Sequence, residues 1–135
     1  MKKAKILDSY AILSLLQNET GADKVSELLE KASNDEEKLY MNWINVGEVY
    51  YQIIRREGKK IADETLTELQ LLPITFVSVT DELVLSAAEA KAKYPIAFAD
   101  CFVIATAKEK KAVIVTGDPE FKEVEAEVKV EWIEG

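Results

Sequence analysis

Apolar and polar positions along the chain follow two periods, one typical of buried strands and one typical of helices. Short, mainly apolar runs occur at 4–8, 38–43, 74–79, 112–118 and 128–133. Between these runs, apolar residues recur at helical spacing over 9–19, 22–33, 44–58, 59–72, 80–93, about 95–110 and 119–125. The pattern therefore predicts strands that alternate with helices.

Glycines and prolines mark the expected helix ends. Gly21 separates the first two helices, Gly58 ends the helix 44–58, and Pro73 closes the next one. Pro95 suits the first turn of the helix that runs to about Lys110.

Alternating strands and helices imply a mostly parallel sheet that is covered on both faces. We therefore expect an α/β protein, a three-layer α/β/α sandwich. No internal repeat, low-complexity segment or Gly/Ser linker divides the 135 residues, so we expect a single domain over 1–135. In such sheets, ligands bind beyond the carboxyl ends of the strands.

Composition excludes several kinds of chemistry. The chain has no histidine, which removes Ser-His-Asp, Cys-His and His-ligated zinc sites, and it has no glycine-rich phosphate loop. Its apolar runs are too short to span a bilayer, so no membrane segment is expected. The single cysteine, Cys101, excludes an internal disulfide framework and is typical of a reducing compartment, so we expect a cytoplasmic protein.

The net charge of −8, taken alone, argues against a nucleic-acid partner. Two local clusters of basic residues qualify that conclusion, because an acidic protein can still carry a basic rim. They consist of Arg55, Arg56, Lys59 and Lys60, and of Lys108, Lys110 and Lys111.

Asp100 lies within "YPIAFADCFVIATA", a run that is otherwise nearly all apolar or small. A buried carboxylate costs several kcal/mol unless it is compensated, and the run 94–107 contains no Lys, Arg or His. The partner of Asp100 must therefore come from elsewhere in the fold or from solution.

Other acids occupy comparable places. Asp8 ends the first predicted strand and Asp118 follows the fourth, so both should reach the same edge of the sheet, while Glu48 lies in the first turns of a helix. Each also has an ordinary structural interpretation: Asp8 or Ser9 as a helix N-cap, Glu48 as an acid favoured by a helix N-terminus, and Asp118 as a turn residue.

Convergence of these carboxylates would require a shared proton or a cation. Without histidine or a thiolate cluster, an all-oxygen site selects Mg²⁺ or Mn²⁺. Such an ion typically activates water and stabilises charge on a phosphodiester.

The segments "KILDSYAIL", "INVGEVYY", "IAFADCFVIATA" and "VIVTGDPEF" resemble, in order and spacing, the acidic motifs of PIN-domain ribonucleases. The size and layout are similar to those of the toxin in VapBC toxin–antitoxin pairs (VapC-like), and the resemblance covers essentially the whole chain. It implies a parallel sheet with strand order 3-2-1-4-5.

Position by position, the resemblance implies catalytic and metal-binding roles for Asp8, Glu48, Asp100 and Asp118. It implies supporting roles for Ser9 and Thr116 and a structural role for the aromatic Phe121. Asn45 occupies a position where many relatives have serine or threonine.

The resemblance also implies hydrolysis of RNA with Mg²⁺ or Mn²⁺, leaving a 5′-phosphate and a 3′-hydroxyl. It further implies a homodimer and a small antitoxin protein whose C-terminal segment lies over the active site. The RNA backbone would contact a basic cluster, either Arg55, Arg56, Lys59 and Lys60 or the lysines at 108–111.

Our interpretation is a metal-dependent endoribonuclease in which Asp8, Glu48 and Asp100 form the primary cation site and Asp118 completes it or holds a second ion. One alternative is a catalytically idle PIN scaffold that acts as a binding module. Another is a phospho-acceptor receiver domain, but that fold needs paired acids after the first strand and an acceptor Asp after the third, and neither is present.

Overall fold

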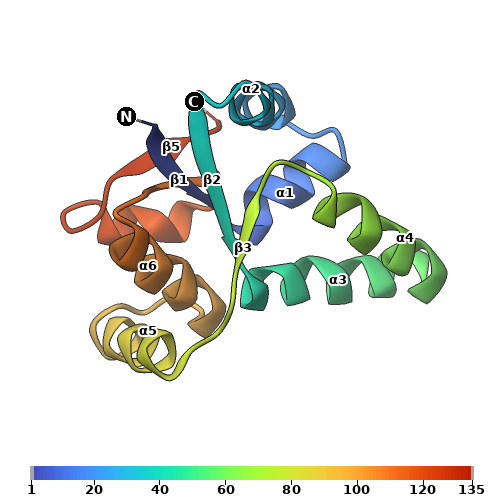
Figure 1. Ribbon diagram of the computed structural model, residues 1–135. Coiled ribbons are helices and arrows are strands. Elements are labelled where there is room, and N and C mark those ends of the chain that lie inside the picture. Colours follow the sequence, from blue (N-terminus) through green and yellow to red (C-terminus); the bar gives the residue numbers. More distant parts are fainter. Residues whose placement is uncertain (1, 135) are drawn as a thin grey trace.

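The fold is described by a computed structural model that covers residues 2–134. Within that range, five strands form one sheet in which every neighbouring pair is parallel, with the order β3-β2-β1-β4-β5 (Figure 1). The strands are β1 (Lys3–Leu7), β2 (Glu37–Asn42), β3 (Thr75–Val77), β4 (Val113–Thr116) and β5 (Val130–Trp132). The predicted strand order is confirmed.

Helices connect the strands and cover both faces of the sheet. They are α1 (Ser9–Leu16), α2 (Ala22–Ser33), α3 (Trp43–Glu57), α4 (Lys59–Gln70), α5 (Asp81–Lys93), α6 (Phe98–Lys110) and the 3₁₀ helix η1 (Pro119–Val124). None of the helices in this described part of the chain is long and apolar enough to cross a bilayer.

The two faces of the sheet pack against different helices. Ile6 and Ile114 point into a core shared with α5 and α6. Their sequence neighbours Leu7 and Val115 point the opposite way, into a core shared with α1 to α4. Because successive side chains of a strand alternate between faces, one apolar run supplies both cores. The predicted three-layer α/β/α sandwich is confirmed (Figure 1).

The register between β1 and β4 positions the carboxyl edge of the sheet. Leu7 pairs with Val115, so the next residues, Asp8 and Thr116, lie side by side where the strands end. Asp8 itself does not extend β1, as the predicted strand 4–8 required, but is the N-cap of α1.

A buried asparagine fixes the start of α3 relative to α6. Asn42 is fully buried at the end of β2, and its Oδ1 accepts a 2.8 Å hydrogen bond from the Ile44 backbone N–H. Its Nδ2 donates to Thr106 Oγ1 at 3.0 Å. The first turn of α3 is therefore held against α6, the helix that carries Asp100.

The prediction that Pro95 lies in the first turn of its helix is wrong, because α6 begins only at Phe98. Ala97 has an extended ψ of 144°, and its N–H donates to Glu120 Oε1 at 3.1 Å instead of entering a helical pattern. Asp100 nevertheless lies in the first turn of α6, as expected.

Candidate functional site

Asp8 is a buried carboxylate with both oxygens engaged. Its Oδ1 accepts a 2.8 Å hydrogen bond from the Ala11 backbone N–H, which caps α1. Its Oδ2 accepts a 2.5 Å bond from the hydroxyl of Thr116, at the end of β4. The N-cap interpretation of Asp8 is thus confirmed, and the same side chain lies at the carboxyl edge of the sheet.

Thr116 connects Asp8 to the segment that carries Asp118. The buried hydroxyl that donates to Asp8 also accepts a 3.0 Å bond from the Asp118 N–H. Asp118 Oδ1 in turn accepts from the Glu120 N–H at 3.0 Å and caps η1. This chain of bonds places Asp118 beside the end of β1.

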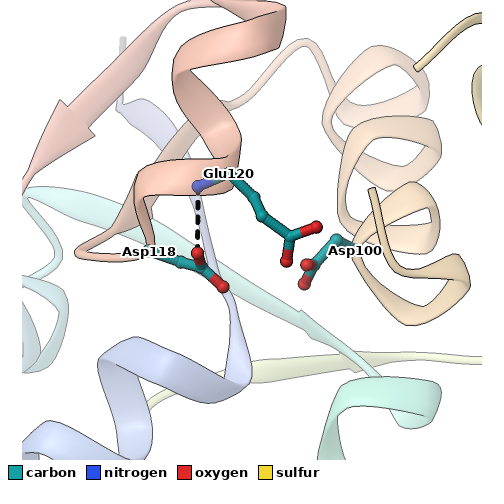
Figure 2. Close-up of side chains that lie close together, drawn as sticks. All are labelled: Asp100, Asp118 and Glu120. Atoms are coloured by element: carbon teal, nitrogen blue, oxygen red, sulfur yellow. Dashed lines mark hydrogen bonds between the residues drawn. The ribbon is translucent and has the colours of Figure 1, made fainter. Parts of the chain in front are cut away.

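Three carboxylates meet in front of this edge. Figure 2 shows Asp100 of α6 facing Asp118 and Glu120, and one oxygen from each lies within 4.8 Å of the others. Asp100 is only 6% exposed. The structure therefore brings together two predicted acids and a third that the sequence did not reveal.

Glu48 is oriented by Asn45, one turn earlier on α3. The Asn45 amide is fully buried; its Nδ2 donates to Glu48 Oε1 at 3.0 Å and to the carbonyl of Ala99 at 3.2 Å. Asn45 therefore ties Glu48 to the residue that precedes Asp100. An asparagine thus joins α3 to α6 at the position where serine or threonine was expected from the resemblance.

The carboxylates act on one another electrostatically. The pKa of Asp100 is raised to about 8, first by burial and then by hydrogen bonding with Glu120. The negative charges of Asp118, Asp8 and Glu48 raise it in the same direction. Asp8 and Glu48 thus act on Asp100 through their charges, although they lie outside the group of Asp100, Asp118 and Glu120.

Burial is also the main cause that raises the pKa of Asp8 to about 7. The hydrogen bonds from Thr116 and Ala11 oppose this shift, whereas the charges of Asp118 and Glu48 reinforce it. Crowded, desolvated carboxylates of this kind are stabilised by a proton or by a cation.

Basic side chains do not supply that cation. Among residues 2–134, none of the lysine or arginine ion pairs involves Asp8, Glu48, Asp100, Asp118 or Glu120. The donors are all carboxylate oxygens, a set that fits a hard divalent ion such as Mg²⁺ or Mn²⁺.

Glu120 was missed because its position depends on tertiary structure. Its Oε1 accepts the N–H of Ala97, 23 residues earlier, and this bond brings η1 to the start of α6. The signal in the sequence was an acid two residues after Asp118, in the first turn of a predicted helix at the same edge. An ordinary helix N-terminal acid has the same signature.

The remaining predicted residues lie around this group. Ser9 is buried at the first position of α1, directly after Asp8, and Phe121 is fully buried in the core shared with α6. Thr116 donates its hydrogen bond directly to Asp8.

The basic cluster at 55–60 lies at the far end of α3 and the start of α4. Seven residues separate Glu48 from Arg55, which corresponds to about 10 Å along the helix. Lys59 pairs with Asp63 at 2.8 Å, and the Arg55 guanidinium lies 5.1 Å from the Tyr51 ring centre. Contact of Arg55, Arg56, Lys59 and Lys60 with RNA stays a prediction.

Solved structures share this fold over nearly their whole length. DNA-bound VapBC from Salmonella typhimurium superposes with a TM-score of 0.76, at 14% identity over 98% of this chain and 99% of that one. VapBC2 from Rickettsia felis, bound to a fragment of its promoter, gives 0.71 at 15% identity over 96% and 98%. VapC20 from Mycobacterium tuberculosis, a toxin that cleaves the sarcin-ricin loop, gives 0.71 at 15% identity over 92% and 95%.

No curated protein matches the chain in sequence. A family model of the PIN domain, in contrast, matches residues 5–127. That range contains all the carboxylates that gather at the edge of the sheet, from Asp8 to Glu120. With this match over most of its length and a sheet in the order 3-2-1-4-5, the chain belongs to the PIN-domain family.

Proposed function

We propose that this protein is a divalent-metal-dependent endoribonuclease and the toxin of a toxin–antitoxin pair. The observation that carries the proposal is the group formed by Asp100, Asp118 and Glu120, with Asp8 and Glu48 acting on it and no basic side chain within residues 2–134 paired with it. Asp8 and Asp100 are buried and the other three acids are half-buried, and clustered acids of this kind without a basic partner are the expected ligands of a divalent ion.

Asp8, Glu48, Asp100 and Asp118 would hold Mg²⁺ or Mn²⁺, and Glu120 lies close enough to Asp118 to join them. When bound, such an ion lowers the pKa of a coordinated water and stabilises negative charge on a phosphodiester. The reaction is attack of water on phosphorus with cleavage of the bond to the 3′ oxygen, which leaves a 5′-phosphate and a 3′-hydroxyl.

The chain itself supplies the geometry for this reaction. The Thr116 hydroxyl fixes one oxygen of Asp8, and Asn45 fixes one oxygen of Glu48. These bonds restrain Asp8 and Glu48, two acids from separate elements whose charges act on Asp100. Preorganised ligands of this kind need no rearrangement when substrate binds.

The partner proposal has a different basis. The solved structures of similar fold include VapBC from two bacteria and a toxin–antitoxin complex from Klebsiella pneumoniae. We propose that this protein, too, forms a homodimer and is silenced by a small antitoxin protein. Co-purification of the chain with the product of a neighbouring small reading frame tests this part independently.

An RNA cleavage assay with the variants Asp8→Asn and Asp100→Asn tests the nuclease. Both substitutions remove a charge and keep the side-chain shape, so activity should fall at least about a hundredfold. Asp23→Asn, at an exposed position on α2, is the matched control and should retain full activity. Unchanged cleavage by both site variants would reject the proposal, and RNA binding without cleavage in Mn²⁺ would favour an idle binding module.

A further inference from the structure

A second charged feature lies at the opposite end of the sheet. The start of β1, the end of α6 and strand β5 enclose a groove of about 580 Å³. In Figure 1 the beginning of β1 lies at the end of that strand away from the first turn of α1, and β4 separates β1 from β5 in the sheet. Six lysines line this lysine groove: Lys2, Lys3, Lys5, Lys110, Lys111 and Lys129.

The lysine groove reverses the charge of the rest of the molecule. Its lining holds six lysines and one acid, Glu131, and thus a formal charge of +5. Because the chain as a whole carries −8, the remaining residues carry −13. The lysine groove is therefore a local concentration of positive charge on an acidic chain.

Several of these lysines have no carboxylate partner. Lys5 pairs with Glu37 at 3.2 Å and with Glu131 at 2.8 Å, so its charge is already neutralised by carboxylates of the fold. Lys3, Lys111 and Lys129 are exposed and form no ion pair with any residue between 2 and 134. Their ammonium groups are available to an external anion.

Lys111 has a left-handed backbone conformation, which favours glycine. It caps α6 with φ 53° and ψ 47°, the left-handed conformation. A side chain in this conformation costs roughly 1 kcal/mol relative to glycine. Its charge offsets part of this cost through the helix dipole, and it also lies at the rim of the lysine groove.

We propose that the lysine groove binds the phosphate backbone of RNA outside the segment that is cleaved; this rests on the proposed nuclease function. RNA is repelled by the −13 carried by the rest of the chain, so association needs a concentrated positive surface. Lysine ammonium groups are point charges that pair with phosphates without reading sequence. A concave, lysine-lined surface fits a phosphodiester strand better than it fits a small anion.

The distance between the two ends sets a length requirement. Five residues of strand separate Lys3 from Asp8, about 17 Å. Eleven helical residues separate Asp100 from Lys111, again about 17 Å. A pentanucleotide cleaved at its central bond extends only two or three nucleotides to either side, roughly 7–10 Å at the spacing of a stacked strand, and falls short of the lysine groove, whereas a long or folded RNA spans the distance.

The test compares two triple variants with the same change in charge. One combines Lys3→Gln, Lys111→Gly and Lys129→Gln. The control combines Lys31→Gln, Lys93→Gln and Lys122→Gln, at positions outside the groove. Thermal unfolding should show no loss of stability from Lys111→Gly, because glycine relieves the left-handed strain.

Binding of a long single-stranded RNA is measured without divalent metal. We expect the groove variant to weaken binding by about tenfold or more and to reduce the salt dependence, log Kd against log salt, by about 2, which is roughly 0.7 for each lysine–phosphate pair removed. The control should change binding by less than about threefold. Equal weakening of RNA binding by both variants, or no weakening, would overturn the proposal. Polyglutamate that competes for the groove as strongly as unlabelled RNA would also overturn it, because the ligand would then be an acidic peptide.

Cleavage assays separate this inference from the proposed function. If wild-type protein cleaves neither a pentanucleotide nor a long RNA in Mn²⁺, the nuclease proposal fails. If it cleaves both, the groove variant should raise KM for the long RNA and leave cleavage of the pentanucleotide unchanged. A groove variant that handles both substrates like wild type would reject the groove alone.

Discussion

The Thr116 hydroxyl donates a 2.5 Å hydrogen bond to Asp8 Oδ2 and accepts one from the Asp118 N–H. This one side chain joins two acids that are far apart in sequence. We predict that Thr116→Val, which removes the hydroxyl and keeps the shape, leaves a buried oxygen of Asp8 unpaired. The free energy of unfolding should fall by about 1–3 kcal/mol. Urea denaturation measures this loss, and nuclease activity should fall with it.

The matched variant is Thr116→Ser, which keeps the hydroxyl. It should retain the activity of wild-type protein and lose only the packing of one methyl group, about 1 kcal/mol. Equal loss of activity in the serine and valine variants would show that the hydroxyl is not what positions Asp8.

The carboxylates give the metal-free protein an unusual dependence on pH. In the folded state the pKa of Asp8 is about 7 and that of Asp100 about 8, against 3.8 for an ordinary aspartate. Between the ordinary pKa of 3.8 and these raised values, the folded chain binds more protons than the unfolded chain, so the free energy of unfolding falls as the pH rises. The contribution of the two protonated carboxyl groups is complete below about pH 4 and is lost as the pH rises to 7–8. For Asp8 this contribution is roughly 4 kcal/mol at most.

Denaturation in a chelator between pH 5 and pH 8.5 measures this effect. Asp100→Asn should make the metal-free protein more stable than wild type at the upper end of this range, because it removes a buried charge. A stability that rises with pH would contradict the shifts. The exposed Glu127, whose pKa is lowered to about 2, titrates outside this window.

Divalent metal should reverse the loss. Because the ion binds only the ionised carboxylates, Mn²⁺ should raise the melting temperature at pH 8 and have little effect at pH 5. Differential scanning calorimetry measures the two shifts. Asp100→Asn should abolish the increase at pH 8, whereas the control Asp23→Asn should keep it.

Asn45 is predicted to position Glu48. Asn45→Ala removes the bonds to Glu48 Oε1 and to the Ala99 carbonyl. Loss of a group that orients a metal ligand typically lowers activity or metal affinity by about 10- to 100-fold. Titration of Mn²⁺ followed by calorimetry measures the affinity. Gln52→Ala, later on the same helix, should bind Mn²⁺ like wild type.

Two glycines should respond oppositely to alanine. A Cβ at Gly117, between Thr116 and Asp118, would lie 2.4 Å from Cε1 of the Tyr10 ring. Gly117→Ala should therefore displace the segment that carries Asp118, destabilise the protein by about 1–3 kcal/mol and lower activity. At Gly47, on α3, no atom lies within 4 Å of the added carbon, so alanine there should stabilise the helix by about 0.5–1 kcal/mol. Thermal unfolding of both variants decides the matter.

The layers could be predicted from the sequence because hydrophobic periodicity reports local structure directly. Asp8 and Asp118 could be assigned to one edge, since parallel strands end together. The place of Asp100 could not be derived, because it depends on how α6 packs in a core built from distant parts of the chain, to which the bond between Asn42 and Thr106 adds. The start of α6 was also misplaced: the helix begins three residues after Pro95, and its extended N-cap, Ala97, donates to a glutamate of η1 that is distant in sequence.

Asp8 and Asp118 each use one oxygen to cap the helix that follows, so each residue carries an architectural duty besides its charge. An alanine scan of this edge would therefore confuse loss of catalysis with unravelling of α1 or η1. Asparagine separates the two effects, because its carbonyl can still accept from the backbone while the amide brings no negative charge. Inactive protein intended for co-crystallisation with RNA should accordingly be made with amides rather than with truncated side chains.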